Sequence, residues 1–398
     1  MNILLVHNFY GSGSPSGENA VFEAELQLLE SRGHHVETFT RHNDQLRGKG
    51  KLGEIQGALS LTWNSTAARE LKELVNRFKA DVVHVHNTFP MISPAIFAAA
   101  RTKAATVLTL HNYRLQCPAA IPARNGSVCT KCITQRSVMP ALYHRCYRDS
   151  LLATSPLAGS IAFHNRRGTW GKDVDAFIAL SKFQKNLMVR GGLPESKMHV
   201  KPNFFPGVPP LPSWDTRHEQ VVFVGRLSRE KGLMSLLRAW EVLGDAAPHL
   251  VVVGDGPLMP EVKSYARRLG IEVKGHLGSE EVQNIIMNSQ LALLPSEWFE
   301  GFPMVIREAF AAGTPVAASA IGPIPEIVLD GVSGVLFPPK NPEKLAEIVY
   351  STFQNKEKLK KMGMAAYQSF RDLYNEDTNY EQLIGIYQSA IQARLANG

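Results

Sequence analysis

The sequence lacks the features that would place it in a membrane or outside the cell. No stretch approaches the roughly 18 consecutive apolar residues that a membrane-spanning helix needs. Residues 1–6 are predicted to form an apolar strand with no basic segment before it, so we expect no signal peptide. There are only four cysteines among 398 residues, which without a secretion signal favours a reducing compartment. These absences predict a cytoplasmic location, with the inner face of the membrane as a further option.

Several recognition motifs are missing as well. No Gly-x-Gly-x-x-Gly follows the first apolar run, and this disfavours a dinucleotide-dependent dehydrogenase. No known nucleic-acid reader motif is present, so we expect no nucleic-acid partner. The chain also contains no low-complexity repeat, and its only repetition is the alternation of strand-like and helix-like segments.

Positive charge is concentrated in the first half of the chain. Residues 1–200 carry 24 lysines and arginines against 14 acidic residues, a net charge of +10. Residues 201–398 carry 19 against 22, a net charge of −3. This asymmetry favours an anionic partner for the first half, such as an anionic membrane surface or a lipid-phosphate acceptor. A well-solvated basic surface without a partner is the alternative.

The length and the pattern of apolar runs predict two α/β domains. A chain of 398 residues is too long for one compact core. Apolar runs that end in glycine or polar residues alternate with helical periodicity, as in parallel sheets covered by helices. The proline-rich stretch 202–214 has no periodicity and separates the halves. We predict Rossmann-like domains at 1–203 and 204–375, a cysteine-rich insertion at 115–150 and a final helix at 376–398.

The most informative stretch is residues 222–232. A short apolar run ends at Gly225, and Arg226 and Lys231 follow before an amphipathic segment. This order predicts a strand, a glycine turn and a helix, with both cations near the carboxyl end of the strand. Open α/β sheets bind ligands at that end. Two converging cations suit a diphosphate, whereas a solvated Arg and Lys in a polar loop is the alternative.

A second element lies at residues 300–308, after the apolar run 291–294. Glu300 is predicted to lie in a loop, and Glu308 one turn into a helix that starts near Pro303. The first-turn amides of such a helix are unpaired donors that favour an anion. Each carboxylate can accept hydrogen bonds from vicinal hydroxyls, as on a ribose or a hexose. The two elements together are therefore the parts of a nucleotide-sugar site.

These motifs, Gly225-Arg226-Leu227…Lys231-Gly232 and Glu300…Glu308, resemble the donor site of the GT-B glycosyltransferases of family 4. This family comprises the retaining group 1 transferases, and the resemblance extends along nearly the whole chain. It implies two Rossmann-like domains facing each other across a cleft, with a C-terminal helix that crosses back to the first domain. It also implies transfer of a sugar from a nucleotide diphosphate donor to a hydroxyl, with retention at the anomeric carbon.

The resemblance carries roles over to individual residues. Arg226 and Lys231 would stabilise the departing diphosphate. Glu300 would hold hexose hydroxyls, and Glu308 the ribose. Ser16 stands where the family's first turn has a glycine, so only Gly17 is carried over there. The remaining substrate-binding positions are Gly225, Gly254, Leu277, Phe302, Pro303, Met304 and Val305.

Histidines end two predicted strands of the first half. His111 follows the apolar run 106–110, and a histidine at the carboxyl tip of a strand can contact a reacting sugar. In the resembled family a histidine at this position lies beside the donor hexose, which makes His111 an active-site candidate. His84 and His86 share one face of the preceding strand. We interpret them as packed, hydrogen-bonded residues behind the site.

All four cysteines, Cys117, Cys129, Cys132 and Cys146, lie in the insertion 115–150. A Cys-x-x-Cys pair with two outlying cysteines could bind a structural zinc ion, which would hold together a loop-like, basic segment. Reduced thiols without zinc are the alternative. Residues 45–63, basic and then weakly apolar, could lie on a membrane surface, and a surface loop is the simpler interpretation.

The sequence thus predicts a glycosyltransferase that uses a nucleotide diphosphate sugar and a hydroxyl acceptor, which could be a lipid-linked glycan. Surface polysaccharide or glycolipid synthesis is the family-level expectation. We expect no organic cofactor and, without a convincing Asp-x-Asp motif, no catalytic divalent metal. A sugar-nucleotide epimerase of the same architecture and a non-catalytic sugar-nucleotide-binding protein are the alternatives.

Overall fold

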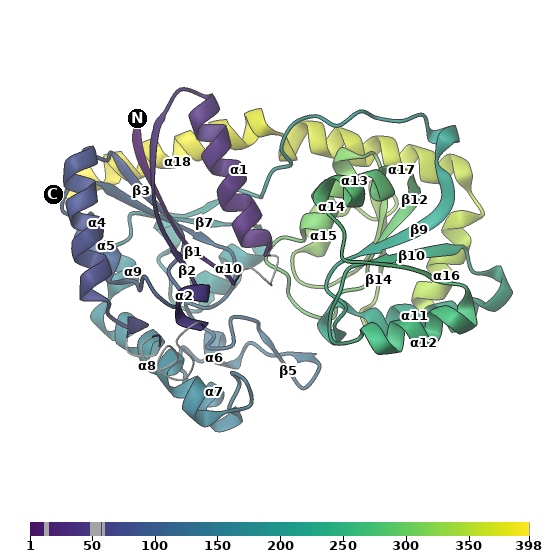
Figure 1. The fold of residues 1–398 in the computed structure, drawn as a ribbon, viewed down its shortest axis with the longest axis horizontal. Coiled ribbons are helices and arrows are strands. Elements are labelled where there is room, and N and C mark those ends of the chain that lie inside the picture. Colours follow the sequence, from purple (N-terminus) through teal and green to yellow (C-terminus); the bar gives the residue numbers. More distant parts are fainter. Residues whose placement is uncertain (12–15, 48–56, 58–59, 398) are drawn as a thin grey trace. The chain divides into compact units, whose positions relative to one another are not determined.

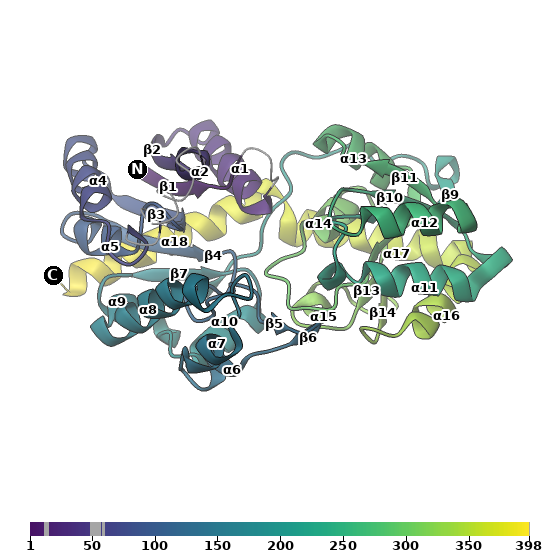
Figure 2. The same cartoon turned by 60° about the horizontal axis from the view of Figure 1, so that its bottom comes forward.

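The computed structural model describes residues 1–11, 16–47, 57 and 60–397. They form two compact units, each built on one six-stranded sheet with flanking helices (Figures 1 and 2). Unit 1 comprises Met1–Pro122, Cys129–Pro202 and Asn379–Gly398, and unit 2 comprises Ala123–Val128 and Asn203–Thr378. The predicted α/β class with two domains is confirmed.

The sheet of unit 1 is entirely parallel and has the strand order β2-β1-β3-β4-β7-β8. Most of its strands are near-continuous apolar runs because both faces of the sheet are covered. Chain order reverses between β1 and β3, so the carboxyl ends of these strands mark a place where doubly wound sheets bind ligands. The strands are β1 (Asn2–Phe9), β2 (His35–His42), β3 (Val82–Asn87), β4 (Ala105–Leu110), β7 (Ala176–Ala179) and β8 (Met198–Val200).

Side-chain caps define where several helices of unit 1 begin. Ser16, Asn64, Ser150 and Ser181 each accept a hydrogen bond from an amide of the first helical turn. The helices are α1 (Gly17–Ser31), α2 (Asp44–Arg47), α4 (Ser65–Phe78), α5 (Ala95–Ala100), α6 (Lys131–Thr134), α7 (Met139–His144), α8 (Leu151–Arg167), α9 (Thr169–Lys172) and α10 (Lys182–Arg190).

The final helix, α18 (Glu376–Asn397), packs on the sheet of unit 1. Leu383, Ile386 and Tyr387 belong to the same buried cluster as Ile3 and Leu5 of β1. Burial of three large apolar side chains against the sheet contributes about 1.5–3 kcal/mol each. The predicted return of the C-terminal helix to the first domain is therefore confirmed.

The sheet of unit 2 is also parallel, and its order β11-β10-β9-β12-β13-β14 is that of a Rossmann fold. Unit 1 has its first three strands in a different order, which the local sequence pattern did not indicate. In unit 2 the chain order reverses between β9 and β12, the strands that precede the two motifs. The strands are β9 (His218–Val224), β10 (His249–Val253), β11 (Glu272–Gly275), β12 (Ser289–Leu294), β13 (Val316–Ser319) and β14 (Gly334–Phe337).

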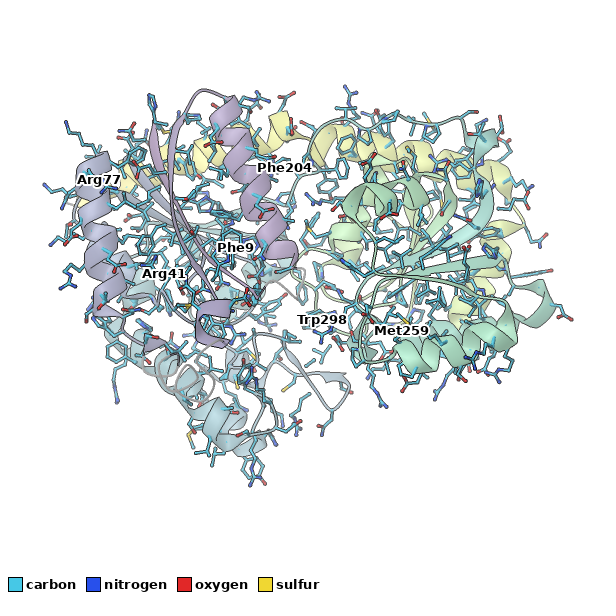
Figure 3. The ribbon with its side chains drawn as sticks, viewed as in Figure 1. Phe9, Arg41, Arg77, Phe204, Met259 and Trp298 are labelled. Atoms are coloured by element: carbon cyan, nitrogen blue, oxygen red, sulfur yellow. The ribbon has the colours of Figure 1, made fainter. Side chains whose placement is uncertain are left out.

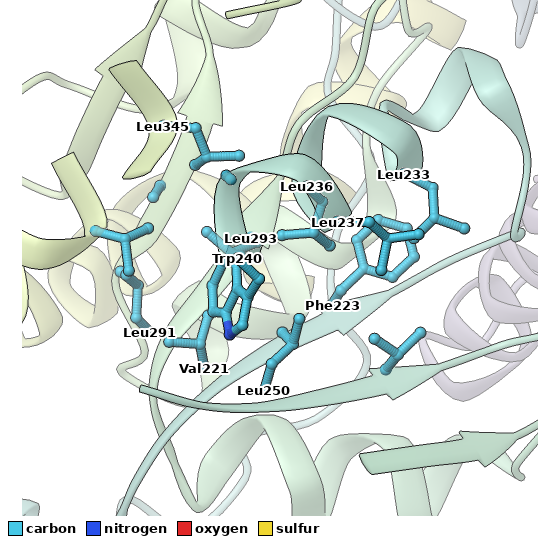
Figure 4. Close-up of a cluster of buried hydrophobic side chains, with 14 of the residues drawn as sticks. Val221, Phe223, Leu233, Leu236, Leu237, Trp240, Leu250, Leu291, Leu293 and Leu345 are labelled. Atoms are coloured by element: carbon cyan, nitrogen blue, oxygen red, sulfur yellow. The ribbon is translucent and has the colours of Figure 1, made fainter. Parts of the chain in front are cut away.

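The core of unit 2 lies between this sheet and α11 (Figure 4). Trp240, Leu236 and Leu237 of α11 pack against Phe223 of β9 and Leu293 of β12, and all five are nearly inaccessible to solvent. This packing fixes the β9 and β12 ends that carry the two motifs. The helices are α11 (Leu233–Leu243), α12 (Met259–Leu269), α13 (Ser279–Met287), α14 (Met304–Ala311), α15 (Ile324–Ile327), α16 (Pro342–Phe353) and α17 (Lys356–Ser369).

Some segments differ from the expected pattern. The insertion 115–150, expected to be loop-like, contains α6, α7 and a short hairpin of β5 (Ala123–Arg124) and β6 (Ser127–Val128). A proline, Pro140, in the first turn of α7 is compatible with this helix because its missing N–H has no partner to lose. Within the described part of the chain, no helix has both the length and the apolar character to cross a bilayer.

Candidate functional site

Two glycine turns of unit 2 are joined by backbone hydrogen bonds at the ends of β9 and β10. Gly225 N–H donates to Val253 O at 3.0 Å, and Leu227 N–H donates to Asp255 O at 2.9 Å. Gly254 has a φ of +133°, and a Cβ there would lie 2.0 Å from the carbonyl oxygen of Gly225. Glycine is therefore required at residue 254 for the turns to meet.

Lys231 and Glu300 form an ion pair at the point where β9 and β12 end. Lys231 Nζ lies 2.8 Å from Oε1 and 3.0 Å from Oε2 of Glu300. Oε1 of Glu300 also accepts from Ser296 Oγ at 2.6 Å and from Trp298 Nε1 at 2.9 Å (Trp298 is labelled in Figure 3). The carboxylate is almost fully buried, whereas the Lys231 side chain keeps 23% of its exposure. The sequence motifs 69 residues apart thus meet in one site.

Backbone contacts hold the two loops of this ion pair together. Glu297 N–H donates to Glu230 O at 2.9 Å. Gly232 adopts a left-handed conformation with a φ of +71°, and a Cβ there would lie 1.7 Å from the carbonyl oxygen of Pro295. Arg226 is exposed at the same end of β9, and among the described residues no acidic side chain forms an ion pair with it. Arg226 is thus a solvent-accessible cation near Lys231 in the sequence.

Helix α14 begins directly after the Glu300 loop. Phe302 is buried, Pro303 is the N-cap, and Met304 and Val305 are the first helical residues. The first-turn amides of a helix have no intrahelical acceptor and carry partial positive charge. Glu308 lies one turn further on, where burial raises the pKa of its carboxyl and the neighbouring Arg307 opposes that rise.

The turn containing Leu277 precedes α13, and this helix contacts α14. Leu277 is half-buried, and Gln283 Nε2 of α13 donates to the carbonyl oxygen of Glu308 at 3.3 Å. The end of β9, the Glu300 loop and the start of α14 thus gather a cationic side chain, a fixed carboxylate and the first helix amides of Met304 and Val305. Chemically, this set can neutralise a diphosphate and hydrogen-bond sugar hydroxyls.

In unit 1, His111 follows β4 and contacts a histidine of β3. Its Nε2 lies 3.0 Å from His86 Nδ1, and the two rings stack with centroids 5.2 Å apart. Burial is the main cause that lowers the pKa of His111 well below its usual value, and the electrostatic effect of His86 adds to it. His111 is therefore neutral near pH 7.

The start of α1 lies beside the residue that follows His111. Ser16 caps α1, Gly17 is its exposed first residue, and Glu18 Oε1 accepts from Asn112 Nδ2 at 2.7 Å. Burial raises the pKa of Glu18, partly offset by its hydrogen bonds. Residues 12–15 of the preceding loop, and most of the basic stretch 45–63, lie outside the described residues.

A mostly apolar cavity of about 80 Å³ lies within unit 1 between the ends of β3 and β4 and helix α8. Its apolar wall includes Phe89, Leu157 and Ile161, and its polar wall includes His111 and Arg114. The Arg114 guanidinium stacks over the Phe89 ring at 4.1 Å. The cavity can take an apolar group close to His111.

The thiols of the four cysteines lie near enough to affect one another, since, besides burial, Cys132 and Cys146 raise the pKa of Cys117, and Cys146 and Cys129 raise that of Cys132. Among the described residues, the only group of three or more potential ligand side chains whose ligand atoms lie within 4.8 Å of one another is Glu25, His84 and His86. Burial raises the pKa of Cys117 to about 12 and that of Cys132 to about 11. Zinc binding would require the thiols to lose their protons.

The cysteine zinc site stays a prediction from sequence spacing, and metal analysis tests it. If Cys117, Cys129, Cys132 and Cys146 ligate zinc, protein purified without chelator should contain one zinc per chain. Changing Cys129 and Cys132 together to serine should remove the metal and lower the unfolding temperature. A zinc content well below one per chain in the unchanged protein would reject the site and leave reduced thiols.

The chain contains one Asp-x-Asp sequence, Asp173-Val174-Asp175, and both of its carboxylates have a structural role in unit 1. Asp175 Oδ2 accepts from the backbone N–H of Thr106 at 2.9 Å and from its hydroxyl at 3.0 Å. Asp173 forms an ion pair with Arg167 at the end of α8. Both carboxylates therefore tie β4, β7 and α8 together.

Sequence reasoning missed several residues of these sites. Ser296 and Trp298 orient Glu300, although nothing in the sequence pattern distinguishes them from other loop residues. Glu25 is different, because it lies between Phe22 and Leu28 on the buried face of α1. A carboxylate at an apolar helix position is a readable signal for a buried polar network.

Fold and site together define a glycosyltransferase of the GT-B type. The model of glycosyl transferases group 1 matches residues 212–369, and the model of glycosyltransferase family 4 matches residues 17–206. The chain belongs to family 4, the group 1 glycosyltransferases.

Individual relatives agree with this assignment. A Bacillus subtilis protein named as a teichuronic acid biosynthesis glycosyltransferase, TuaC, is 27% identical over 378 residues, covering 88% of each chain. An uncharacterized glycosyltransferase of Methanocaldococcus jannaschii is 32% identical over 133 residues, which span 32% of this chain and only 34% of that relative. The Anabaena protein HepE in complex with UDP-glucose has a TM-score of 0.64 at 17% identity, covering 98% of this chain and all of that one, and so shares the fold.

Proposed function

We propose that this glycosyltransferase moves a sugar from a nucleoside diphosphate sugar to a hydroxyl acceptor with retention at the anomeric carbon. The Lys231–Glu300 ion pair carries this proposal, because it places a cation and a fixed carboxylate at the switch point of the unit 2 sheet. A structural neighbour, HepE, was solved with UDP-glucose, which supports a donor of this class.

In the proposed mechanism, unit 2 stabilises the leaving diphosphate. Arg226 and Lys231 neutralise the charge that develops on the phosphate oxygens, and the amides of Met304 and Val305 donate in the same direction. Glu300, fixed by Ser296 and Trp298, accepts hydrogen bonds from hexose hydroxyls. Glu308 binds the ribose, whose hydroxyls would give its desolvated carboxylate hydrogen-bond donors.

His111 of unit 1 is proposed to contact the transferred sugar near its reacting carbon. A neutral imidazole can accept a hydrogen bond from a sugar hydroxyl without placing positive charge beside a cation-like transition state. The turn at Gly17, next to Asn112, is assigned to the donor phosphates by the family resemblance. The acceptor is assigned to unit 1, where the apolar cavity near His111 lies.

A donor screen tests this function. At a concentration of 100 times its Kd, the correct nucleoside diphosphate sugar should stabilise the folded chain by about 2.7 kcal/mol. This corresponds to a rise in unfolding temperature of roughly 5–10 °C for a domain of about this size. The measurement is thermal unfolding with UDP-, GDP-, ADP- and dTDP-linked sugars and the matching free diphosphates. If none of them shifts the transition, the nucleotide-sugar assignment is wrong.

The same screen separates the alternatives. A transferase should release the nucleoside diphosphate only slowly without an acceptor and rapidly with one. A sugar-nucleotide epimerase should change the donor on its own, which NMR of the sugar protons would reveal. A binding protein should give stabilisation without any product.

We also propose that unit 1, to which the acceptor is assigned, contacts an anionic membrane through α7 and α8. These two helices lie side by side in unit 1 (Figures 1 and 2). Leu152 is 88% exposed, Tyr143 83% and Met139 65%, so three large apolar side chains of these helices face solvent. Residues 82–172 contain one acidic residue against eleven lysines and arginines. Apolar side chains among basic ones fit the interface of an anionic bilayer. A lipid-linked acceptor would be met at such a surface.

Vesicle sedimentation tests this surface. The chain should bind vesicles that contain phosphatidylglycerol and bind those of phosphatidylcholine alone much more weakly, with affinity falling as salt rises. Changing Tyr143 and Leu152 together to glutamate should weaken binding by about 10-fold or more. Val242→Glu, at a site 57% exposed on α11 of unit 2, is the matched control and should have no effect. Equal binding to both lipids would contradict the proposal.

A further inference from the structure

Unit 1 buries an ion pair behind His111. Glu25 of α1 and Lys201, which follows β8, have side chains that each keep only 1% of their exposure. Lys201 Nζ lies 2.7 Å from Glu25 Oε1 and 3.0 Å from Oδ1 of Asn379 in α18. Removing both charges from water costs several kcal/mol per ion, so such a pair is weak evidence for a purely stabilising role.

The second oxygen of Glu25 faces two histidines of β3. Glu25 Oε2 lies 3.6 Å from His84 Nδ1 and 3.3 Å from His86 Nε2. Both ring nitrogens of His84 have other partners, Tyr387 Oη at 2.8 Å and Thr109 Oγ1 at 2.7 Å. With Lys201 already on the carboxylate and His84 fully engaged, the group does not offer a metal ion a set of free ligands.

The hydrogen-bond partners of His86 differ from those of His84. Within the described part of the chain, neither its Nε2 nor Glu25 Oε2 has a hydrogen-bond partner elsewhere, although both atoms are inaccessible to water. A buried donor and acceptor without partners would each cost about 1–3 kcal/mol. The two atoms satisfy each other if His86 carries its proton on Nε2 and directs it at the carboxylate.

The position of the proton on the His86 ring determines how His86 hydrogen-bonds to His111. A neutral His86 with Nε2–H has a lone pair on Nδ1, and Nδ1 lies 3.0 Å from His111 Nε2. His111 must then donate from Nε2, which leaves its own Nδ1 as a hydrogen-bond acceptor. The charges agree with neutral rings, since Lys201 already balances Glu25.

We propose that Glu25 and Lys201, acting through His86, hold His111 as the neutral Nε2–H tautomer, so that its Nδ1 accepts a hydrogen bond from the substrate. Glu25, Lys201 and His86 are positioning residues in this arrangement, and His111 is the residue that touches substrate. The inference rests on the proposed function for the identity of that substrate and on the geometry of unit 1 for the tautomer.

Other charged and titratable groups around the histidines are compatible with neutral rings. His7 of β1 lies across from His86 with ring centroids 6.2 Å apart, and burial lowers the pKa of His7 to about 3. Burial also lowers the pKa of His84 and raises that of Tyr387 in α18. Glu18 of α1 lies near enough to interact with His86 and Arg114. None of these groups places a full positive charge in direct contact with His111.

The first test needs no substrate. In ¹⁵N-histidine NMR at pH 7, with His111 assigned by its loss in His111→Gln, the His111 ring should be neutral with its proton on Nε2. In Glu25→Gln, the new amide can donate to His86 Nε2, which moves the His86 proton to Nδ1. His111 should then switch to the Nδ1–H tautomer. An Nδ1–H tautomer in the unchanged protein, or no switch in Glu25→Gln, would overturn the proposal.

The second test uses the pH profile of kcat/KM with the donor found in the screen. Glu25→Gln should lower kcat about 10-fold or more at every pH, since the tautomer is wrong throughout. Lys201→Gln leaves the carboxylate uncompensated, and this attracts a proton to the histidine pair. Its activity should be near normal at high pH, and the acidic limb of its pH profile should move to higher pH by about one unit or more.

Tyr387→Phe is the matched control. It removes a buried hydroxyl from the same core but contacts His84 instead of His86, so the acidic limb should stay in place. Thermal unfolding of each variant shows whether it is folded at the assay temperature. If the acidic limb of the pH profile moved equally in Tyr387→Phe and Lys201→Gln, the cause would be a general structural effect. That result would overturn the proposal. If no donor is turned over, the proposed function fails, and the NMR result alone still decides this inference.

Discussion

Changing Arg226 and Lys231 together to alanine should lower donor turnover by about 100-fold or more, because each cation stabilises charge that develops on the leaving diphosphate. Most of the loss should appear in kcat, since the contact strengthens in the transition state. The fold should persist, because Arg226 is exposed and Lys231 is partly exposed. The measurement is release of nucleoside diphosphate under saturating donor and acceptor.

Arg229→Ala is the control for charge loss in the same loop. Arg229 is exposed and lies between the two cations in the sequence, in the short 3₁₀ turn Arg229–Lys231. Its removal should change turnover less than about threefold, the range of a screened surface charge. If the Arg229 variant lost as much activity as the double variant, general electrostatics would explain the effect, and the specific roles of Arg226 and Lys231 would be wrong.

Gly232→Ala should disrupt the donor site through the backbone. Its Cβ would lie 1.7 Å from the carbonyl oxygen of Pro295, so the loops that carry Lys231 and Glu300 would have to separate. Overpacking of this kind, in addition to left-handed strain, should lower the free energy of unfolding by about 3 kcal/mol or more. Urea unfolding and donor Kd measure the two consequences.

Gly270→Ala isolates the cost of the left-handed conformation. Gly270 has a φ of +66°, close to the +71° of Gly232, but a Cβ there would meet nothing within 4 Å. We expect the free energy of unfolding to fall by about 1–2 kcal/mol and the donor affinity to stay unchanged. If Gly232→Ala and Gly270→Ala lowered stability equally, the backbone near Pro295 would adjust to the new Cβ at little cost. The close approach of Gly232 to Pro295 would then not hold the site together.

The sequence predicts the donor half of the site well because its signals are local. Gly225 ends an apolar strand, Pro303 begins a helix, and cations and carboxylates follow at fixed spacing. In parallel sheets the carboxyl ends of strands meet at one edge, so the two motifs are expected to bring residues 231 and 300 near each other. Their direct ion pair required the tertiary contact between the Glu230 and Glu297 loops.

Local sequence patterns do not predict the histidine network of unit 1. Glu25 and Lys201 are 176 residues apart, and Lys201 shows no periodic pattern that marks it as buried. The strand period places His84 and His86 on one face and predicts a packed role for both, whereas their different partners depend on α1 and α18. The strand order of unit 1 likewise depends on long-range packing that residue spacing does not encode.

A crystal structure of the chain with its nucleoside diphosphate, obtained with the donor that the screen identifies, tests the central claim most directly. We expect the diphosphate within hydrogen-bond distance of Lys231 Nζ and the first amides of α14, with the ribose hydroxyls on Glu308. A diphosphate bound elsewhere, with the Lys231–Glu300 pair untouched, would contradict it.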